Sequence, residues 1–197
     1  ELALQGKHNT FNALAAGLSA RLLHVRDEAI RESLAHFEGL EHRMESVAHV
    51  GGIHFINDSK ATNPHAASAS IMSALSVIWI AGGLAKGATM GQLVDRIKSR
   101  VRVAILIGED RELIASELGK RAPHIEIVRI DTPAEYSKGG DSNALMESVI
   151  RTAKERAISG DTVLLAPACA SMDQFISYGD RGDRFRAAVE KVVRDGN

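Results

Sequence analysis

The residues from Asn57 to Asn63 carry more polar chemistry than a connecting loop needs. Their sequence, NDSKATN, supplies a carboxylate, an ammonium group, two hydroxyls and two amides. An alternating apolar stretch at 53–56 precedes them and predicts a strand, and Pro64 follows them at the expected start of a helix. Because α/β proteins bind anions where a strand ends and a helix begins, this loop is the first candidate binding site.

Two further loops carry side chains of the same kind. Lys86 lies in a glycine-rich turn after a predicted strand at 77–82, and Ser171 follows a predicted strand at 162–166. Parallel strands would bring all three loops to one edge of a sheet. A lysine and two hydroxyls, those of Thr62 and Ser171, are suitable partners for carboxylates. The alternative interpretation is that this cluster is not a binding site.

Strands and helices are predicted to alternate along most of the chain. Beyond the first strand, strands are expected at 77–81, 101–107, 125–128 and 162–166. Helices are expected at 64–75, at 89–100, from 110 toward 123, at 144–158 and around 185–193. Asn63 and Asp110 are the expected caps of the first and the third of these helices. Most of these strands are apolar on both faces, which predicts an α/β fold with a Rossmann-like, doubly wound, mainly parallel sheet. Two glycines at 51–52 predict a hairpin of 44–50 with 53–58 as an antiparallel edge.

The first forty residues have a different pattern, in which helices dominate. Residues 1–6 indicate a short strand and turn, and Asn9 or Thr10 is expected to cap a helix with leucines at four-residue intervals. Asp27 is expected to cap a second helix. Gly39-Leu40 is a candidate hinge between domains, because a helix pattern ends there and a strand pattern follows.

Composition narrows the class of protein. The chain has 197 residues, 45% of them hydrophobic, and can bury a core. Its net charge of −1, from 24 basic and 25 acidic residues, does not favour nucleic acid or an anionic membrane as a partner. No apolar run approaches the roughly 20 residues of a membrane span, and no signal peptide is recognisable. The single cysteine, Cys169, excludes an internal disulfide, fits a reducing cytoplasm and is expected to be a small buried residue.

Two other motifs are interpreted as structural. His49 and His54 are expected to be surface strand residues rather than metal ligands, because no third ligand has suitable spacing. The tripeptide Arg181-Gly182-Asp183 opens an amphipathic helix and is interpreted as a turn and cap.

Five ordered blocks resemble the Mur ligases and, within that family, the branch that adds D-glutamate. They are GKHN with NALAA at 6–16, FEGLEHRME at 37–45, NDSKATN at 57–63, GGLAKG at 82–87, and PACASMDQF with RGDRF at 167–185. Together they span nearly the whole chain. The resemblance implies an ATP-dependent ligase of peptidoglycan precursor synthesis, which forms an amide bond through an acyl phosphate.

The resemblance also implies a pocket for D-glutamate. It implies that Lys86 and Thr62 bind one carboxylate of the amino acid. Ser171 and the backbone near Tyr178 would bind the other, with Met172 as an apolar wall.

Nucleotide contacts follow from the same resemblance. Asn9 and Asn12 would lie near the adenine of ATP, Arg43 would reach the nucleotide when the domains close, and Asp58 would accept hydrogen bonds from the ribose. Lys60 is a possible support for catalysis. Without the resemblance, the two asparagines would be a cap and a solvated amide, and Arg43 would form an exposed ion pair with Glu45.

The chain contains no G-x-x-x-x-G-K-[ST] phosphate loop, so the phosphate loop and the Mg²⁺ ligands are expected upstream. We therefore expect residues 1–39 to be the tail of an ATP-binding domain and residues 40–197 to be the C-terminal, D-glutamate-binding domain. The expected partners are ATP, D-glutamate and UDP-N-acetylmuramoyl-L-alanine, and the protein is expected to be a monomer. Another amino-acid ligase of the Mur or folylpolyglutamate type, or a non-catalytic binding module of this fold, is the alternative.

Overall fold

The computed structural model describes residues 7–37, 39–132 and 142–195. The chain divides into two compact units between Leu40 and Glu41.

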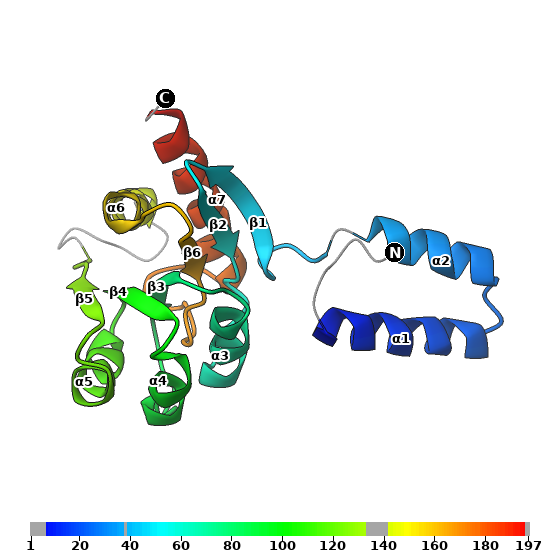
Figure 1. Ribbon diagram of the computed structural model, residues 1–197, viewed down its shortest axis with the longest axis horizontal. Coiled ribbons are helices and arrows are strands. Elements are labelled where there is room, and N and C mark those ends of the chain that lie inside the picture. Colours follow the sequence, from blue (N-terminus) through cyan, green and yellow to red (C-terminus); the bar gives the residue numbers. More distant parts are fainter. Residues whose placement is uncertain (1–6, 38, 133–141, 196–197) are drawn as a thin grey trace. The chain divides into compact units, whose positions relative to one another are not determined.

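The first unit consists of helices α1 (Lys7–Leu22) and α2 (Asp27–His36) (Figure 1). The expected caps are wrong: Asn9 and Thr10 lie within the first turn of α1, and α2 begins at Asp27 itself, with Arg26 at the N-cap position. Asp27 instead forms an ion pair with Arg21 (3.2 Å) and lies in the helical turn where a negative charge is favourable. The strand and turn predicted for 1–6 lie outside the described residues.

The two helices of this unit bury little apolar surface. They approach each other at Gly17, which faces Ile30 and Leu34 of α2. Nevertheless α2 has no buried residue, and Phe11 on α1 is 70% exposed. The other large apolar side chains left exposed in this unit are Leu14, Leu18, Leu22, Leu23, Val25, Phe37 and Leu40.

The second unit is built on a six-stranded sheet with the order β1-β2-β6-β3-β4-β5. The strands are β1 (Glu45–Val50), β2 (Ile53–Asn57), β3 (Val77–Gly82), β4 (Val101–Ile107), β5 (Glu126–Arg129) and β6 (Thr162–Leu165). Every neighbouring pair is parallel except β1 with β2. The predicted mainly parallel sheet with an antiparallel edge hairpin is therefore confirmed.

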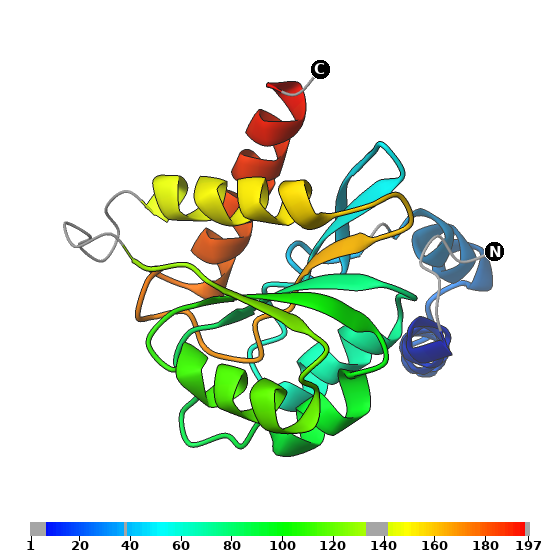
Figure 2. The same ribbon diagram turned by 60° about the vertical axis from the view of Figure 1, so that its left-hand side comes forward.

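Helices cover both faces of this sheet (Figures 1 and 2). On one face lie α3 (Pro64–Met72), α4 (Gly91–Ile97) and α5 (Arg111–Arg121), and on the other lie α6 (Ser142–Arg156) and α7 (Tyr178–Arg194). The central strands β3 and β4 are almost wholly buried because both of their faces pack against helices. Trp79 is fully buried in this core, where its indole N–H donates to the Ala166 carbonyl (2.8 Å).

The edge hairpin has the turn that its glycines predict. Gly51 and Gly52 have φ values of 59° and 75°, and Val50 pairs with Ile53 across the two-residue loop. Positive φ at both central positions matches the right-handed twist of the two strands and requires residues such as glycine. His49 and His54 face each other on this hairpin, with ring centroids 5.5 Å apart.

Asp161 anchors the edge of the sheet at which the parallel strands begin. Its carboxylate accepts hydrogen bonds from Arg102 Nη2 (2.6 Å), Ser76 Oγ (2.5 Å) and the Ile158 N–H (2.9 Å). Burial alone would raise the pKa of Asp161, but these donors hold the pKa below its ordinary value. Arg102 is thus an arginine with a direct carboxylate partner.

Candidate functional site

Four loops meet at the opposite edge of the sheet, where the parallel strands end. They are residues 58–63 after β2, 83–90 after β3, 108–110 after β4 and 166–177 after β6. Backbone hydrogen bonds join them directly: the Ala168 N–H donates to the Ala61 carbonyl (2.9 Å), and Leu84 and Ala170 form an isolated β-bridge. The predicted convergence of the three polar loops at one edge is therefore confirmed.

The loop after β2 uses its polar residues in two ways. Asn57, Asp58 and Ser59 are buried, so the first half of this segment belongs to the interior of the fold. Lys60 is exposed, and its Nζ lies 5.7 Å from the centroid of the Tyr178 ring in a cation–π contact. Thr62 is half-buried.

Asn63 ends this loop and begins α3 as predicted. Its side-chain oxygen accepts a hydrogen bond from the Ala66 N–H (2.9 Å), and Pro64 occupies the first helical turn. The helix N-terminus is therefore fixed directly behind the polar loop.

The loop that carries Lys86 is held close to its neighbours. A Cβ on Gly83 would lie 2.0 Å from the Ala170 carbonyl oxygen, so only glycine permits this approach of the two backbones. Asp110 does not cap α5 with its side chain, contrary to the prediction; its carboxylate accepts the Ala85 N–H (2.7 Å) instead. This bond fixes the backbone beside Lys86, whose side chain is exposed and whose φ is 50°.

The segment after β6 places the remaining predicted pocket residues at the same edge. Ser171 is buried and directly follows Ala170, which bridges to the loop of Lys86. Met172 is half-exposed, and Tyr178 begins α7 with its ring partly exposed beside Lys60. The structure therefore brings together the loops of all five predicted D-glutamate residues, and a side-chain contact joins Lys60 to Tyr178.

The segment 42–44, just after the division between the units, carries Arg43. His42 and Met44, on either side of Arg43, both have positive φ (60° and 50°), and the Arg43 side chain is exposed. The alternative ion pair with Glu45 is not formed, because Glu45 binds Arg186 (2.9 Å). Although burial opposes it, the hydrogen bonds from Arg186 and from the His42 N–H lower the pKa of Glu45.

Asp58 links this segment to the polar loop. Its carboxylate accepts the Met44 N–H (3.2 Å) and the Ser70 hydroxyl of α3. Asn9 and Asn12 lie on α1, in the other unit.

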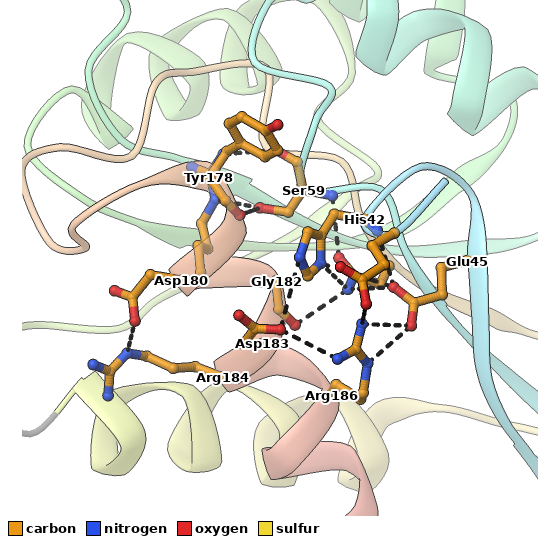
Figure 3. A network of polar contacts seen from close by, with 12 residues as sticks. His42, Glu45, Ser59, Tyr178, Asp180, Gly182, Asp183, Arg184 and Arg186 are labelled. Atoms are coloured by element: carbon orange, nitrogen blue, oxygen red, sulfur yellow. Dashed lines mark hydrogen bonds and ion pairs between the residues drawn. The ribbon is translucent and has the colours of Figure 1, made fainter. Parts of the chain in front are cut away.

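His42 is the centre of a buried polar network that sequence reasoning missed (Figure 3). Its Nδ1 lies 3.0 Å from Asn57 Nδ2, and its Nε2 lies 3.7 Å from a carboxylate oxygen of Asp183 on α7. Its ring meets that of Tyr178 edge to face, with centroids 6.4 Å apart. Segment 42–44 is thereby fastened to both β2 and α7.

Arg181 is the second missed residue. The prediction of a turn and cap is wrong, because Ser177 caps α7 through a bond from the Asp180 N–H (3.1 Å), whereas Arg181 is buried within the helix. Burial lowers the pKa of Arg181 to about 10, which still leaves the guanidinium charged at neutral pH. Its position four residues before the buried Phe185 was the available signal, since i and i+4 share a helix face.

Cys169 is buried, as predicted. Desolvation by burial raises the pKa of its thiol to about 12, so the reactive thiolate is scarce at neutral pH. Within residues 7–37, 39–132 and 142–195, no three His, Cys, Asp or Glu side chains form a group that could hold a metal ion. Nor does this part of the chain contain a helix long and apolar enough to span a membrane.

Comparisons with known proteins agree with this architecture. The family model described as "Mur ligase, glutamate ligase domain" matches residues 42–169. The chain is 47% identical over 182 residues to UDP-N-acetylmuramoylalanine--D-glutamate ligase of Streptomyces avermitilis, a match that covers 92% of this chain and 37% of the relative. It is 41% identical over 215 residues to the ligase of the same name from Mycolicibacterium smegmatis, covering 98% of this chain and 44% of the relative.

A solved structure shares the fold. The UDP-N-acetylmuramate-alanine ligase of Thermotoga maritima aligns with a TM-score of 0.64 and 18% identity, over 100% of this chain and 40% of that chain. The class defined by the fold and the family model is the glutamate ligase domain. The chain belongs to the Mur ligase family, and it spans less than half the length of these curated relatives.

Proposed function

We propose that this chain is the C-terminal part of an ATP-dependent ligase that adds D-glutamate to UDP-N-acetylmuramoyl-L-alanine in peptidoglycan precursor synthesis. The observation that carries the proposal is the set of relatives of that activity by name, 41–47% identical over most of the chain, together with the convergence of the polar loops. In this proposal residues 1–39 come from the ATP-binding domain, and residues 40–197 bind the incoming amino acid.

The exposed edge of the sheet supports a pocket for a dianionic amino acid. Among the residues that the structure describes, no carboxylate lies within ion-pair distance of Lys86 Nζ, so this ammonium group is available to an external anion. We assign Lys86 and Thr62 to one carboxylate of D-glutamate. Ser171 and the backbone at Tyr178 bind the other, and Met172 supplies apolar contact.

The proposed nucleotide contacts come from a second set of residues. Arg43 offers an exposed guanidinium, which suits a phosphate-bearing ligand, and Asp58 beside it can accept hydroxyl donors. Asn9 and Asn12 are assigned to the adenine, and Lys60 to support of the reacting groups. Because the sequence has no G-x-x-x-x-G-K-[ST] phosphate loop, we assign the Mg²⁺ ligands to the remainder of the ligase. We place the enzyme in the cytoplasm as a monomer.

A chimera tests the function directly. The part of the Streptomyces avermitilis ligase that precedes its match would be joined to this chain, and amide formation would be measured with ATP, UDP-N-acetylmuramoyl-L-alanine and each of D-glutamate, L-glutamate and D-aspartate. We expect ATP-dependent product with D-glutamate, and none from this 197-residue chain alone. A folded chimera that prefers another amino acid, or forms no product while the parent enzyme does, would refute the proposal.

Two variants of the chimera test the assigned sites. Lys86→Ala removes a charge-assisted hydrogen bond worth about 1.5–3 kcal/mol, which corresponds to roughly 10- to 150-fold in affinity. The KM for D-glutamate should rise by that order and the KM for ATP should change less. Arg43→Ala should raise the KM for ATP more than the KM for D-glutamate. If Lys86→Ala leaves the KM and the kcat for D-glutamate within about twofold of the parent, the pocket is misplaced.

A further inference from the structure

Arg181 is an arginine buried in an unusual way. Only 1% of its surface is exposed, yet no carboxylate among the described residues lies within ion-pair distance of its guanidinium. The acid that influences it most, Asp173, acts from further away. Arg102, at the opposite edge of the sheet, is by contrast more exposed and paired directly with Asp161. Because a buried charge without a direct counterion is costly, its hydrogen bonds must compensate.

The guanidinium of Arg181 donates hydrogen bonds to two loops. Nε donates to Ser59 Oγ (2.9 Å) and Nη2 to the Ser59 carbonyl (2.9 Å), so one residue is held by a two-point clamp. Nη1 and Nη2 also reach the Cys169 carbonyl at 3.3 and 3.4 Å. Ser59 Oγ in turn donates to the Tyr178 carbonyl (2.7 Å; Figure 3). The side chain of Arg181 therefore joins loop 58–63 to loop 166–177, and Ser59 joins the first of these loops to the start of α7.

Each of these partners belongs to, or lies close in sequence to, a proposed pocket residue. Ser59 lies three residues before Thr62, Cys169 lies two residues before Ser171, and the third partner is the carbonyl of Tyr178 itself, in the first turn of α7. A displacement of Ser59 or Cys169 would therefore also move the nearby pocket side chains, because the backbone between them is short and hydrogen-bonded.

We propose that Arg181 is a positioning residue, whose guanidinium sets the spacing between loop 58–63 and loop 166–177 and thereby the distance between the two carboxylate-binding ends of the pocket. The inference rests on the proposed function. It predicts that loss of the clamp weakens binding of the amino acid and reduces discrimination by its length. The nucleotide contact assigned to Asp58 should be affected less, because this carboxylate is held separately by the Met44 N–H and the Ser70 hydroxyl.

Lysine cannot replace this arginine. A guanidinium offers five donors in a planar fork, whereas an ammonium group is a single point charge that cannot bind Ser59 at two positions and Cys169 at the same time. Arg181→Lys therefore keeps the charge and removes the geometry, which separates positioning from electrostatics.

The experiment uses the chimeric ligase with Arg181→Lys and, as matched control, Arg184→Lys. Arg184 lies on the same helix but donates to Asp180 (2.9 Å) and Asn143 (3.1 Å), neither of which belongs to loop 58–63 or loop 166–177. We expect Arg181→Lys to raise the KM for D-glutamate about tenfold or more, to change the KM for ATP less than about twofold, and to reduce the preference for D-glutamate over D-aspartate. The control should match the parent in all three.

Two results would overturn the inference. One is a folded Arg181→Lys enzyme whose KM for D-glutamate stays within about twofold of the parent, and the other is an equal rise of both KM values, which indicates general loosening. If Arg181→Lys does not fold, Ser59→Ala decides: it removes one leg of the clamp and should raise the KM for D-glutamate several-fold, so an unchanged KM refutes the role. An inactive parent chimera, by contrast, refutes the proposed function itself.

Discussion

The two units of this chain place the same kinds of residue in opposite environments. Phe185 of α7 is fully buried beneath the sheet, whereas Phe11 of α1 is 70% exposed. Strands β3 and β4 have nearly every residue buried, and α2 has none. The contrast lies in what each unit offers its apolar side chains, since one has a sheet covered on both faces and the other has two helices.

This difference shows where the stability of the chain resides. Burial of apolar surface is the main favourable term in folding, and short helices without a packed face are marginal in water. Residues 41–197 contain their own core and should fold independently. Within residues 7–37, helices α1 and α2 bury little apolar surface against each other, which fits the proposal that they belong to a larger domain.

Hydrogen exchange should show the largest contrast. Amides in β3 and β4 should exchange through global unfolding, which for a domain costs about 5–15 kcal/mol. Amides in α1 and α2 should exchange with little protection, because local opening exposes almost no new apolar surface. Uniformly strong protection over both units would contradict this account.

A pair of phenylalanine substitutions sharpens the comparison. Phe185→Ala leaves a cavity in the core and should lower the free energy of unfolding by about 3–5 kcal/mol. Phe11→Ala, at an exposed position, should change it by less than about 0.5 kcal/mol. Chemical denaturation followed by Trp79 fluorescence measures both, and equal effects would mean that the first unit shares the core of the second.

Protonation of Asp161 should make the stability of the second unit depend on pH. The pKa of Asp161 is below its unfolded value of about 3.9, so its contribution is present above that pH and is lost as pH falls through the folded pKa. Asp161→Asn should cost about 2 kcal/mol at neutral pH and flatten the acid limb of the stability profile.

Surface ion pairs should give the smallest effects. Arg186→Gln breaks the half-buried pair with Glu45 and should cost about 0.5–1 kcal/mol, less at high salt. Arg21→Gln breaks the exposed pair with Asp27, and no measurable change is expected. Thermal unfolding in low and high salt distinguishes the two, and a larger loss from Arg21→Gln would reverse the ranking of the units.

The parts of the fold that the sequence predicts are those with local causes. Asn63 caps α3 because its own side chain reaches an N–H three residues away, and the turn at 51–52 depends only on its two glycines. The alternation of buried strands and helices is likewise written in short apolar runs, and it led to the correct sheet.

The errors concern side chains whose partners are distant in the chain. Arg181 binds a serine 122 positions away, and no local pattern distinguishes such a bond from an exposed helix start. Asp110 is a residue type that caps helices and occupies the N-cap position of α5. Its carboxylate nevertheless accepts a hydrogen bond from the Ala85 N–H, 25 residues earlier in the chain. The loops of the candidate site could therefore be predicted, whereas the contacts that hold them could not.

The burial of Cys169 has a practical consequence for studying motion in this protein. A thiol with a pKa near 12 and 1% exposure should be inert to maleimide dyes while the sheet is folded. A cysteine introduced at an exposed position such as Lys60 could therefore be labelled selectively with the native residue in place. The slow alkylation of the native thiol would then report the complete unfolding of the domain.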